Sequence, residues 1–288
     1  MYVLGVHDHG ADRDRLDRVV DRVVDRFSRE GRVGVVRYDA TIADGTTAAE
    51  ALTVGGDVTY GLGADGDWTA TGTGMDVASA LDQLTPTCDY AVVVGVPGLR
   101  YPSVLVDPAT AVDDAAEGPD DTDAAGEVLA TVESPADVDE DALLESLHAT
   151  EPHETLESLV TRVKRSPKAE RSGAIATFTG RVRTKDDPDD DPTEYLEFEK
   201  YEGVAEERMA TIERELEARD GVLEVELYHR TGVVERGEDI VFVVVLAGHR
   251  EEAFRTVEDG INRLKDEVPL FKKEVTVDDE FWVHERSA

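Results

Sequence analysis

Residues 239–268 read DIVFVVVLAGHREEAFRTVEDGINRLKDEV, and this stretch decides the fold of the second half of the chain. From Asp239 to Ala247 the side chains are almost all apolar and mostly β-branched, which predicts a buried strand. After Gly248, apolar side chains recur every three or four positions, which predicts an amphipathic helix over 250–267. The apolar face of this helix consists of Phe254, Val257, Ile261, Leu264 and Val268.

The segments on either side of this stretch show the same two kinds of periodicity. Strands are expected at 173–183, 195–201, 223–230, 270–277 and 281–283, and a second helix at 203–219. Strands and helices do not alternate regularly as they do in a doubly wound sheet. The second half of the chain is therefore expected to have an α+β fold.

The first 112 residues have a different organisation. A short apolar strand at Tyr2–Val6 is followed by helical spacing of apolar residues from Leu16 to Phe27. Two further apolar runs, Val33–Val36 and Tyr90–Val94, read as buried strands. This part is expected to be an α/β domain built on a parallel sheet, and the Gly- and Thr-rich stretch from Thr53 to Gly74 suits short antiparallel strands.

A strongly acidic stretch separates the two halves. Residues 113–150 carry 13 acidic side chains and no Lys or Arg, with few apolar residues before Val128. Such a segment cannot bury enough apolar surface to fold alone, so it is expected to be a solvated linker. The expected division is a first domain at 1–112, an acidic linker at 113–150 and a second domain at 151–288. A short helix at 139–147 would close the first domain or open the second.

The charge of the chain excludes several kinds of partner. Its 65 Asp and Glu against 30 Lys and Arg give a formal net charge of −35, so its surface should repel nucleic acids and anionic membranes. The single cysteine, Cys88, cannot form an internal disulfide, and no stretch has the apolar length of a signal sequence or membrane span. We expect a soluble, cytoplasmic protein.

The balance among the basic residues is unusual as well. Only 7 of the 30 basic residues are lysines, and all of these lie at or beyond Lys164. An acid-rich surface poor in lysine is tolerated best in concentrated salt, where repulsion between surface charges is screened. We therefore expect a halophilic protein, and unfolding on addition of salt would contradict this expectation.

The first domain contains an incomplete phosphate-binding motif. Gly5 and Gly10 keep the spacing of a G-x-x-x-x-G loop, but Ala11 and Asp12 stand where such loops need a Lys and a Ser or Thr. Without the lysine and the hydroxyl, the loop has no cation for phosphate and no ligand for Mg²⁺. Two glycines alone are a weak signal, and an ordinary tight turn is the favoured explanation for them.

The layout of residues 1–107 nevertheless resembles the MobB family of P-loop proteins. Arg37–Asp39 ends the second strand, and Asp89–Gly95 has the place of the family's D-x-x-x-x-E-G strand, with Val94 in place of the acid. The resemblance implies a P-loop-like α/β scaffold that is degenerate at its phosphate site. Whether it binds a nucleotide stays open.

Positive charge in the second half gathers in a few places. In the helix over 250–267, Lys265 lies beside the buried stripe, where it could border a pocket. Arg250 begins this helix, where the helix dipole disfavours a cation, so an anionic ligand near His249 and Arg250 is one explanation. A surface ion pair of Arg250 with Glu251 or Glu252 is an equally good one.

The run Pro269–Glu274 places two lysines side by side on an expected strand. Because side chains alternate between the faces of a strand, only one of Lys272 and Lys273 can enter a site. Arg183 could add a two-pronged donor for an anion if the strand before it ends nearby. His229 ends another strand and could reach the same edge, although a histidine in this place is more often a packing residue.

Several blocks of the second half occur together, in order and with matching spacing. They are GAIATFTGRVR at 173–183, LEFEKY at 196–201, HRTG at 229–232, HREEAF at 249–254, Lys265, and PLFKKE at 269–274. Over residues 152–285 the chain resembles the MoaE family, the catalytic subunits of molybdopterin synthase. The resemblance implies an α/β hammerhead fold and a homodimer that carries one small ubiquitin-like subunit at each end.

The resemblance also implies the reaction and the residues. The substrate would be cyclic pyranopterin monophosphate, and the sulfur would come from a thiocarboxylate at the Gly-Gly C-terminus of the small partner. Lys265 and Lys272 match the family's catalytic lysines. The implied substrate-binding residues are Phe178, Arg181, Val182, Arg183, His249, Arg250, Lys273 and Glu274. Neither a metal nor a cofactor is implied.

Two departures from the family pattern and two rival functions remain. Asn262 stands where the family usually has Asp, and Phe271 where it often has Trp, which puts the shape of the pocket in doubt but removes no cation. One rival is a non-catalytic assembly or regulatory protein of the molybdenum cofactor pathway, which the incomplete P-loop supports. The other is a bifunctional fusion that binds nucleotide in its first domain, which the same residues weaken.

Overall fold

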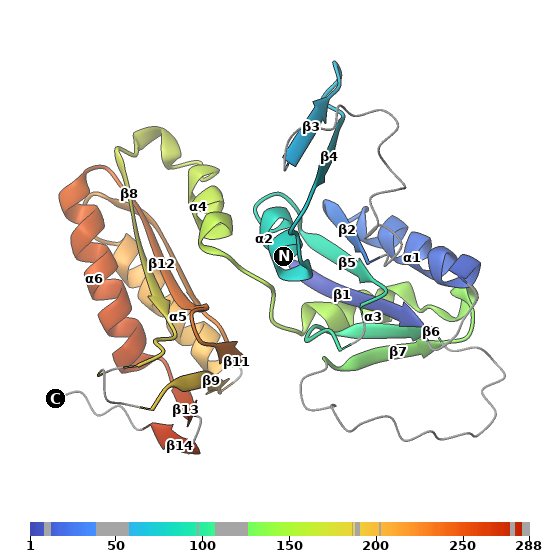
Figure 1. Cartoon of the computed structure of the whole chain (residues 1–288). Helices are drawn as coiled ribbons and strands as arrows, with labels where there is room; N and C mark the ends of the chain where they lie inside the picture. The colour runs from blue at the N-terminus through green and yellow to red at the C-terminus, as the bar shows by residue number, and fades with distance from the viewer. Residues whose placement is uncertain are drawn as a thin grey trace. The chain divides into compact units, whose positions relative to one another are not determined.

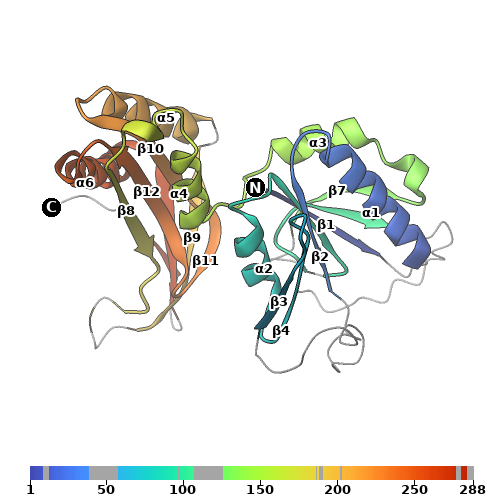
Figure 2. The same cartoon turned by 90° about the horizontal axis from the view of Figure 1, so that it is seen from above.

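The structure is a computed structural model of the whole chain, shown in Figures 1 and 2. It divides into two compact units, Met1–His153 and Glu154–Ala288, and each is described by itself. The residues that the structure describes are 1–8, 13–38, 58–96, 98–106, 126–185, 187, 191–201, 203–276 and, for the backbone, 280–283. Among these residues, no helix is both long and apolar enough to cross a membrane.

The first unit is built on a five-stranded sheet with the strand order β2-β5-β1-β6-β7. All four strand pairings in this sheet are parallel, as the sequence predicts for an α/β domain. A separate antiparallel hairpin, β3–β4, projects from the sheet (Figure 1). The described elements are β1 (Tyr2–Asp8), α1 (Arg13–Phe27), β2 (Val33–Arg37), β3 (Val58–Leu62), β4 (Trp68–Gly72), α2 (Val77–Leu84), β5 (Tyr90–Val94), β6 (Ser103–Val106), β7 (Val128–Val132), η4 (Pro135–Asp137) and α3 (Glu140–His148).

Helices cover both faces of this sheet, with α1 and α3 on one face and α2 on the other (Figure 2). Side chains of β1 pack alternately on the two faces of the sheet. Leu4 and Val6 pack with the α1 and α3 side, whereas Val3 packs with the α2 side. Burial on both faces is why the strands of a parallel sheet are continuous apolar runs.

The structure departs from the expected linker. From Gly126 onward, residues of the stretch 113–150 belong to the first unit, because β7 pairs in parallel with β6 and α3 packs against α1. Leu143, Leu144 and Leu147 of α3 are buried in the core of that unit. In the sequence, these leucines stand among many acidic residues, so the apolar face that attaches the segment to the sheet is not apparent from composition. Residues 113–125 lie outside the described residues.

The structure places the first glycine of the incomplete phosphate-binding motif in a strand and not in a loop. Gly5 lies inside β1, which continues to Asp8, and it pairs with Val93 on one side and Ser103 on the other. A Cβ at Gly5 would lie 3.2 Å from a Leu99 methyl, so this glycine allows close packing against the next segment. Gly10, Ala11 and Asp12 lie outside the described residues.

The second unit contains two antiparallel sheets. One has the order β10-β12-β8 and the other the order β11-β9-β13-β14, which agrees with the predicted α+β fold. The described elements are α4 (Leu156–Lys164), η5 (Ala169–Arg171), β8 (Ala174–Arg181), β9 (Thr193–Lys200), α5 (Val204–Glu217), β10 (Val222–His229), β11 (Gly232–Glu235), β12 (Asp239–Ala247), α6 (Arg250–Glu267), β13 (Leu270–Thr276) and β14 (Glu280–Val283).

The strand β12 is the centre of the second unit. Val241, Val243 and Val245 face α5 and α6, whereas Phe242 and Val244 face α4 on the other side of the sheet (Figure 1). Both sets of side chains are buried, which explains why this strand is an uninterrupted apolar run. The helix α6 places Val257, Ile261 and Leu264 against this sheet, as its periodicity predicts. Phe254, expected on the same buried face, is exposed.

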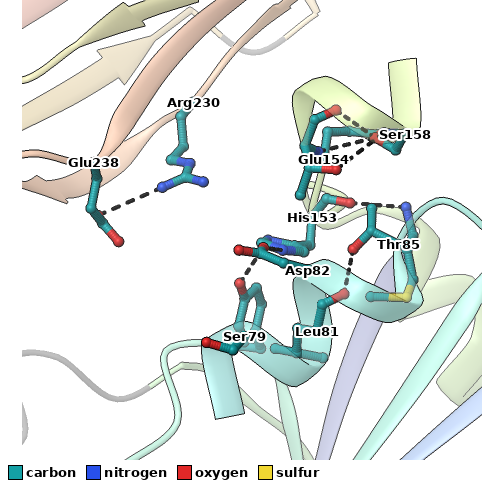
Figure 3. A network of polar contacts seen from close by, with 12 residues as sticks. Ser79, Leu81, Asp82, Thr85, His153, Glu154, Ser158, Arg230 and Glu238 are labelled. Atoms are coloured by element: carbon teal, nitrogen blue, oxygen red, sulfur yellow. Dashed lines mark hydrogen bonds and ion pairs between the residues drawn. The ribbon is translucent and has the colours of Figure 1, made fainter. Parts of the chain in front are cut away.

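The two residues at the boundary between the units, His153 and Glu154, each make polar contacts within their own unit (Figure 3). On the side of the first unit, His153 Nε2 lies 2.8 Å from Asp82 Oδ1, and His153 Nδ1 lies 2.9 Å from the Tyr101 hydroxyl. On the side of the second unit, the Ser158 hydroxyl donates to Glu154 at 2.5 Å. Each of the two residues that flank the junction is thus fixed to its own unit.

Candidate functional site

The second unit contains a pocket of about 1180 Å³ between its two sheets and the C-terminal part of α6. This volume is slightly above the range of about 300–1,000 Å³ that is usual for sites of small organic molecules, so the pocket has room for one. It is lined by Phe178, Thr179, Gly180, Arg181, Arg183, Thr193, Leu196, Phe198, His229, Ile240, Val241, Ile261, Leu264, Lys265, Val268, Leu270, Phe271, Lys272 and Glu274.

The strand β13 sends alternate side chains into the pocket. Its residue Lys272 pairs with Phe198 of β9, and Glu274 pairs with Leu196, so these side chains share one face of the sheet. Lys273 points to the other face, where its Nζ lies 3.9 Å from Glu197. Of the two adjacent lysines, Lys272 therefore lines the pocket and Lys273 does not.

The carboxylate of Glu274 is fixed in the pocket by a neighbouring strand. The hydroxyl of Thr193 on β9 donates a hydrogen bond to Glu274 Oε1 at 2.5 Å, and Thr193 is buried. Sequence reasoning missed Thr193, since only the pairing of β13 with β9 brings it to Glu274. A buried threonine at the start of a strand carries no signal of its own in the sequence.

The helix α6 supplies the second lysine. Ile261 and Leu264 are buried against the sheet, and Lys265 follows directly after Leu264 at the border of the same buried face. The side chain of Lys265 lines the pocket together with Ile261 and Leu264. The sequence periodicity predicted this place for Lys265.

The end of β8 supplies two arginines. Arg181 lines the pocket, but its guanidinium also donates to the Gly237 carbonyl and lies 3.1 Å from Asp239 Oδ1. Arg183 lines the pocket two residues further along, whereas Val182 between them is buried in the core and does not. The alternation of side chains after β8 explains this difference.

The structure does not bring His249 and Arg250 to this pocket. His249 is the residue directly before α6, and Arg250 begins the helix. Lys265 lies fifteen positions after Arg250, which corresponds to about 22 Å along an α-helix. The charge pattern of the sequence suggested one shared anion site, but the length of α6 keeps these residues out of the pocket in the same chain.

The electrostatic character of the pocket is opposite to that of the whole chain. Its lining includes the basic residues Arg181, Arg183, Lys265 and Lys272, and one carboxylate, Glu274. This concentration of positive charge occurs in a protein with a net charge of −35. A pocket with this lining has the charge to attract an anionic molecule, and the apolar residues Phe178, Phe198 and Leu196 can contact a flat ring. Elsewhere in the described ranges, no group of three or more His, Cys, Asp or Glu side chains is arranged to hold a metal ion.

A second cluster of ionisable groups lies on α5 and β10, away from the pocket lining. Burial raises the pKa of Glu213 to about 7, and the neighbouring carboxylates of Glu226 and Glu217 add to this shift. One carboxylate oxygen of Glu213 accepts a hydrogen bond from the backbone N–H of Leu227 at 2.8 Å. Glu213 therefore holds its proton at a pH at which an exposed glutamate is ionised.

This shift predicts a dependence of stability on pH. Between about pH 4.5 and pH 7, folded Glu213 retains a proton that the unfolded chain releases, so the free energy of unfolding falls as the pH rises through this window. Glu213→Gln keeps the acceptor for Leu227 and cannot ionise. We expect this variant to exceed the wild type in thermal stability at about pH 8 and to match it more closely at about pH 5. Equal differences at both pH values, or the same behaviour in the exposed control Glu207→Gln, would contradict this explanation.

Comparison with known proteins identifies the second unit. The family model described as MoaE protein matches residues 149–267. A protein of Haloferax volcanii named "Probable molybdopterin synthase" is 50% identical over 288 residues, which is 99% of this chain and 100% of that protein. The crystal structure of molybdopterin synthase from Staphylococcus aureus is 35% identical and covers 40% of this chain and 83% of that chain, with a TM-score of 0.38.

The first part of the chain is similar to a different solved structure. The crystal structure of a MobB protein homolog from Bacillus stearothermophilus matches it with 18% identity and a TM-score of 0.37. That match covers 52% of this chain and 100% of the other. The full-length similarity to the Haloferax protein shows that the chain belongs to the molybdopterin synthase family, and the match to the MoaE model places the MoaE region at residues 149–267.

Proposed function

We propose that the chain is the catalytic subunit of a molybdopterin synthase and acts in the biosynthesis of the molybdenum cofactor. The observation that carries this proposal is the pocket of the second unit, which gathers Arg181, Arg183, Lys265 and Lys272 in a strongly acidic protein. A phosphorylated heterocycle such as cyclic pyranopterin monophosphate fits both the cations and the aromatic side chains that line it.

In this proposal, the two lysines of the pocket stabilise the transition state of sulfur transfer. In each of two sulfur transfers, the thiocarboxylate sulfur bonds to a carbon of the pterin side chain, and a C–O bond of that carbon breaks. Water then attacks the acyl carbon, the bond between that carbon and sulfur breaks, and the partner is released with an ordinary carboxylate. Negative charge develops on the acyl oxygen during this step. The ammonium groups of Lys265 and Lys272 would stabilise that charge, because fixed cations stabilise a transition state without reorganisation of solvent. Arg183 and Arg181 would hold the phosphate.

The sulfur has to come from another protein. Cys88, the one cysteine of the chain, belongs to the first unit, so the second unit has no sulfur nucleophile of its own. We propose a small ubiquitin-like partner whose C-terminal Gly-Gly thiocarboxylate enters the pocket. Glycines suit such a tail, because a chain without side chains can pass through a narrow opening.

His249 and Arg250 are proposed to act from a second copy of the chain. In their own chain they lie a helix length away from Lys265, so they would reach a pocket only across a dimer interface. A homodimer within a heterotetramer, together with a hammerhead form of the second domain, is the assembly that fits this placement. Lys273, on the far face of β13, would then contribute through its ion pair with Glu197 and not through the substrate.

We propose a supporting role for the first unit, as a MobB-like domain with a degenerate phosphate site. The catalytic domain would begin near the junction at Glu154, with residues 1–153 as a separate domain. Titration of the full chain with Mg-GTP tests this role. Tight binding would favour the bifunctional alternative over a degenerate scaffold.

The decisive experiment is a single-turnover assay with purified components. The full chain is mixed with thiocarboxylated partner and cyclic pyranopterin monophosphate, and the dithiolene product is measured. Product formation that requires all three components supports the proposal. A folded chain that binds the partner but forms no product would favour the non-catalytic assembly function.

A further inference from the structure

We propose that His229 orients the substrate in the pocket by accepting a hydrogen bond through its Nε2 atom. This inference rests on the proposed function and adds a substrate-contacting residue to it. The position of His229 at the end of β10 gave only a weak signal in the sequence. The structure places the side chain in the pocket lining, where it is 7% exposed.

The hydrogen bonding of the ring determines which nitrogen is available. His229 Nδ1 lies 2.8 Å from the backbone carbonyl oxygen of Arg230. A carbonyl oxygen can only accept, so Nδ1 must carry the hydrogen. In a neutral imidazole the other nitrogen, Nε2, then has a lone pair and acts as an acceptor.

Contacts of the ring place it close to the proposed chemistry. The ring of Phe198 packs edge-on against His229, with their centroids 4.8 Å apart. Phe198 pairs directly with Lys272, so their side chains lie on the same face of the β9–β13 sheet. Both Lys272 and His229 therefore adjoin Phe198, one through strand pairing and the other through ring packing.

The strand pairing of the other sheet connects His229 to the opposite wall. His229 pairs with Val241 of β12, and Val241 pairs in turn with Gly180 of β8. Val241 and Gly180 both line the pocket. A ligand that lies over this row would have Arg181 next to Gly180 at one end and His229 at the other.

The surroundings of His229 keep its ring neutral. Burial, together with the positive charge of Lys200 on β9, lowers the pKa of His229 to about 4. The charged residues of the same pocket are Arg181 and Arg183 after β8, Lys265 on α6, and Lys272 with Glu274 on β13, of which only Glu274 is acidic. The neighbouring Arg230 pairs with Glu238 at 3.6 Å and does not line the pocket (Figure 3).

A neutral acceptor adds a kind of recognition that the cations cannot supply. Arginine and lysine side chains only donate hydrogen bonds, so they recognise phosphate and other acceptors. His229 Nε2 recognises a donor, such as a ring or exocyclic N–H. The substrate class that matches both is a heterocycle with an anionic group at one end and N–H groups on its ring, as in a phosphorylated pterin.

Two substitutions separate this role from simple packing. In His229→Asn the amide can replace the Nδ1–H donor to Arg230 but has no group at the position of Nε2. In His229→Gln the amide reaches the position of Nε2 but loses the donor. We expect His229→Asn to be the more stable of the two variants and to raise KM about tenfold above that of the wild type, with a smaller change in kcat. His229→Gln should be the less stable variant but should have the lower KM of the two.

The outcomes of this comparison are distinct. Opposite rank orders of KM and thermal stability in the two variants support the inference. If activity simply follows stability, or if His229→Asn has the KM of the wild type, His229 is a packing residue and the inference is wrong. A wild-type chain that forms no product overturns the proposed function itself, and the inference with it.

A measurement on the wild-type chain does not depend on how the variants fold. In protein labelled with ¹⁵N-histidine, His229 should show a protonated Nδ1 and an unprotonated Nε2 at neutral pH. Addition of cyclic pyranopterin monophosphate should shift the Nε2 resonance toward that of a hydrogen-bonded acceptor. An Nε2–H tautomer, or an Nε2 resonance that the substrate leaves unchanged, would overturn the inference.

Discussion

Replacement of Lys272 by alanine is expected to slow dithiolene formation by about 10²–10³-fold, the usual cost of removing one preorganised charge from an active site. Lys272 lines the cationic pocket from β13, where its side chain shares a face with Phe198 and Glu274. The measurement is the single-turnover rate with the chain in excess over the pterin substrate and with the thiocarboxylated partner at a saturating concentration. Thermal stability should change little, because the partly exposed side chain contributes little to the core.

The neighbouring lysine provides a matched control. Lys273 has the same charge and the same strand but points to the opposite face, where it pairs with Glu197 at 3.9 Å. Such an ion pair contributes little to stability, so Lys273→Ala should retain a rate within a few-fold of the wild type. Equal losses in the two variants would show that the local charge of β13 matters and not the pocket position of Lys272.

Leu264→Ala is expected to lower the stability of the second unit by about 2–5 kcal/mol, the range found when a buried leucine is truncated and leaves a cavity. Leu264 is 1% exposed, packs in the main core of this unit, and lines the pocket directly before Lys265. Because the chain has two units, the free energy is best measured by native-state hydrogen exchange of the β12 amides.

A control on the same helix tests whether burial is the cause. Phe254 of α6 is larger than Leu264, but it is 66% exposed. Phe254→Ala should therefore change the exchange of β12 amides by about 0.5 kcal/mol or less. Similar losses in both variants would mean that α6 is weakened as a helix, and that the buried contact of Leu264 is not the determining factor.

Much of the second unit could be predicted from local pattern alone. The apolar run of β12 and the periodicity of α6 are strong signals, because both elements bury their side chains against the same core. The same reasoning placed Lys265 at the border of the buried face and allowed only one of Lys272 and Lys273 into a site. The structure agrees on both points.

Other features depend on contacts between segments that are distant in the sequence. The attachment of β7 to β6 could not be read from an acidic stretch, since an edge strand of a parallel sheet needs only a short apolar run. The separation of Arg250 from Lys265 follows from the length of α6, which a search for clustered charge ignores. The role of Thr193 in holding Glu274 appears only when β9 and β13 are paired.

The pairing of β13 with β9 has a consequence for how such an enzyme can vary. Leu270 lies opposite Lys200 and Glu274 opposite Leu196, and this alignment presents one of two adjacent ammonium groups to the pocket. If the pairing of β13 with β9 shifted by one residue, Lys273 would enter the pocket in place of Lys272, and Glu274 would point away from it. A single-residue insertion or deletion before Leu270 would thus disable the chemistry while every functional side chain is still present.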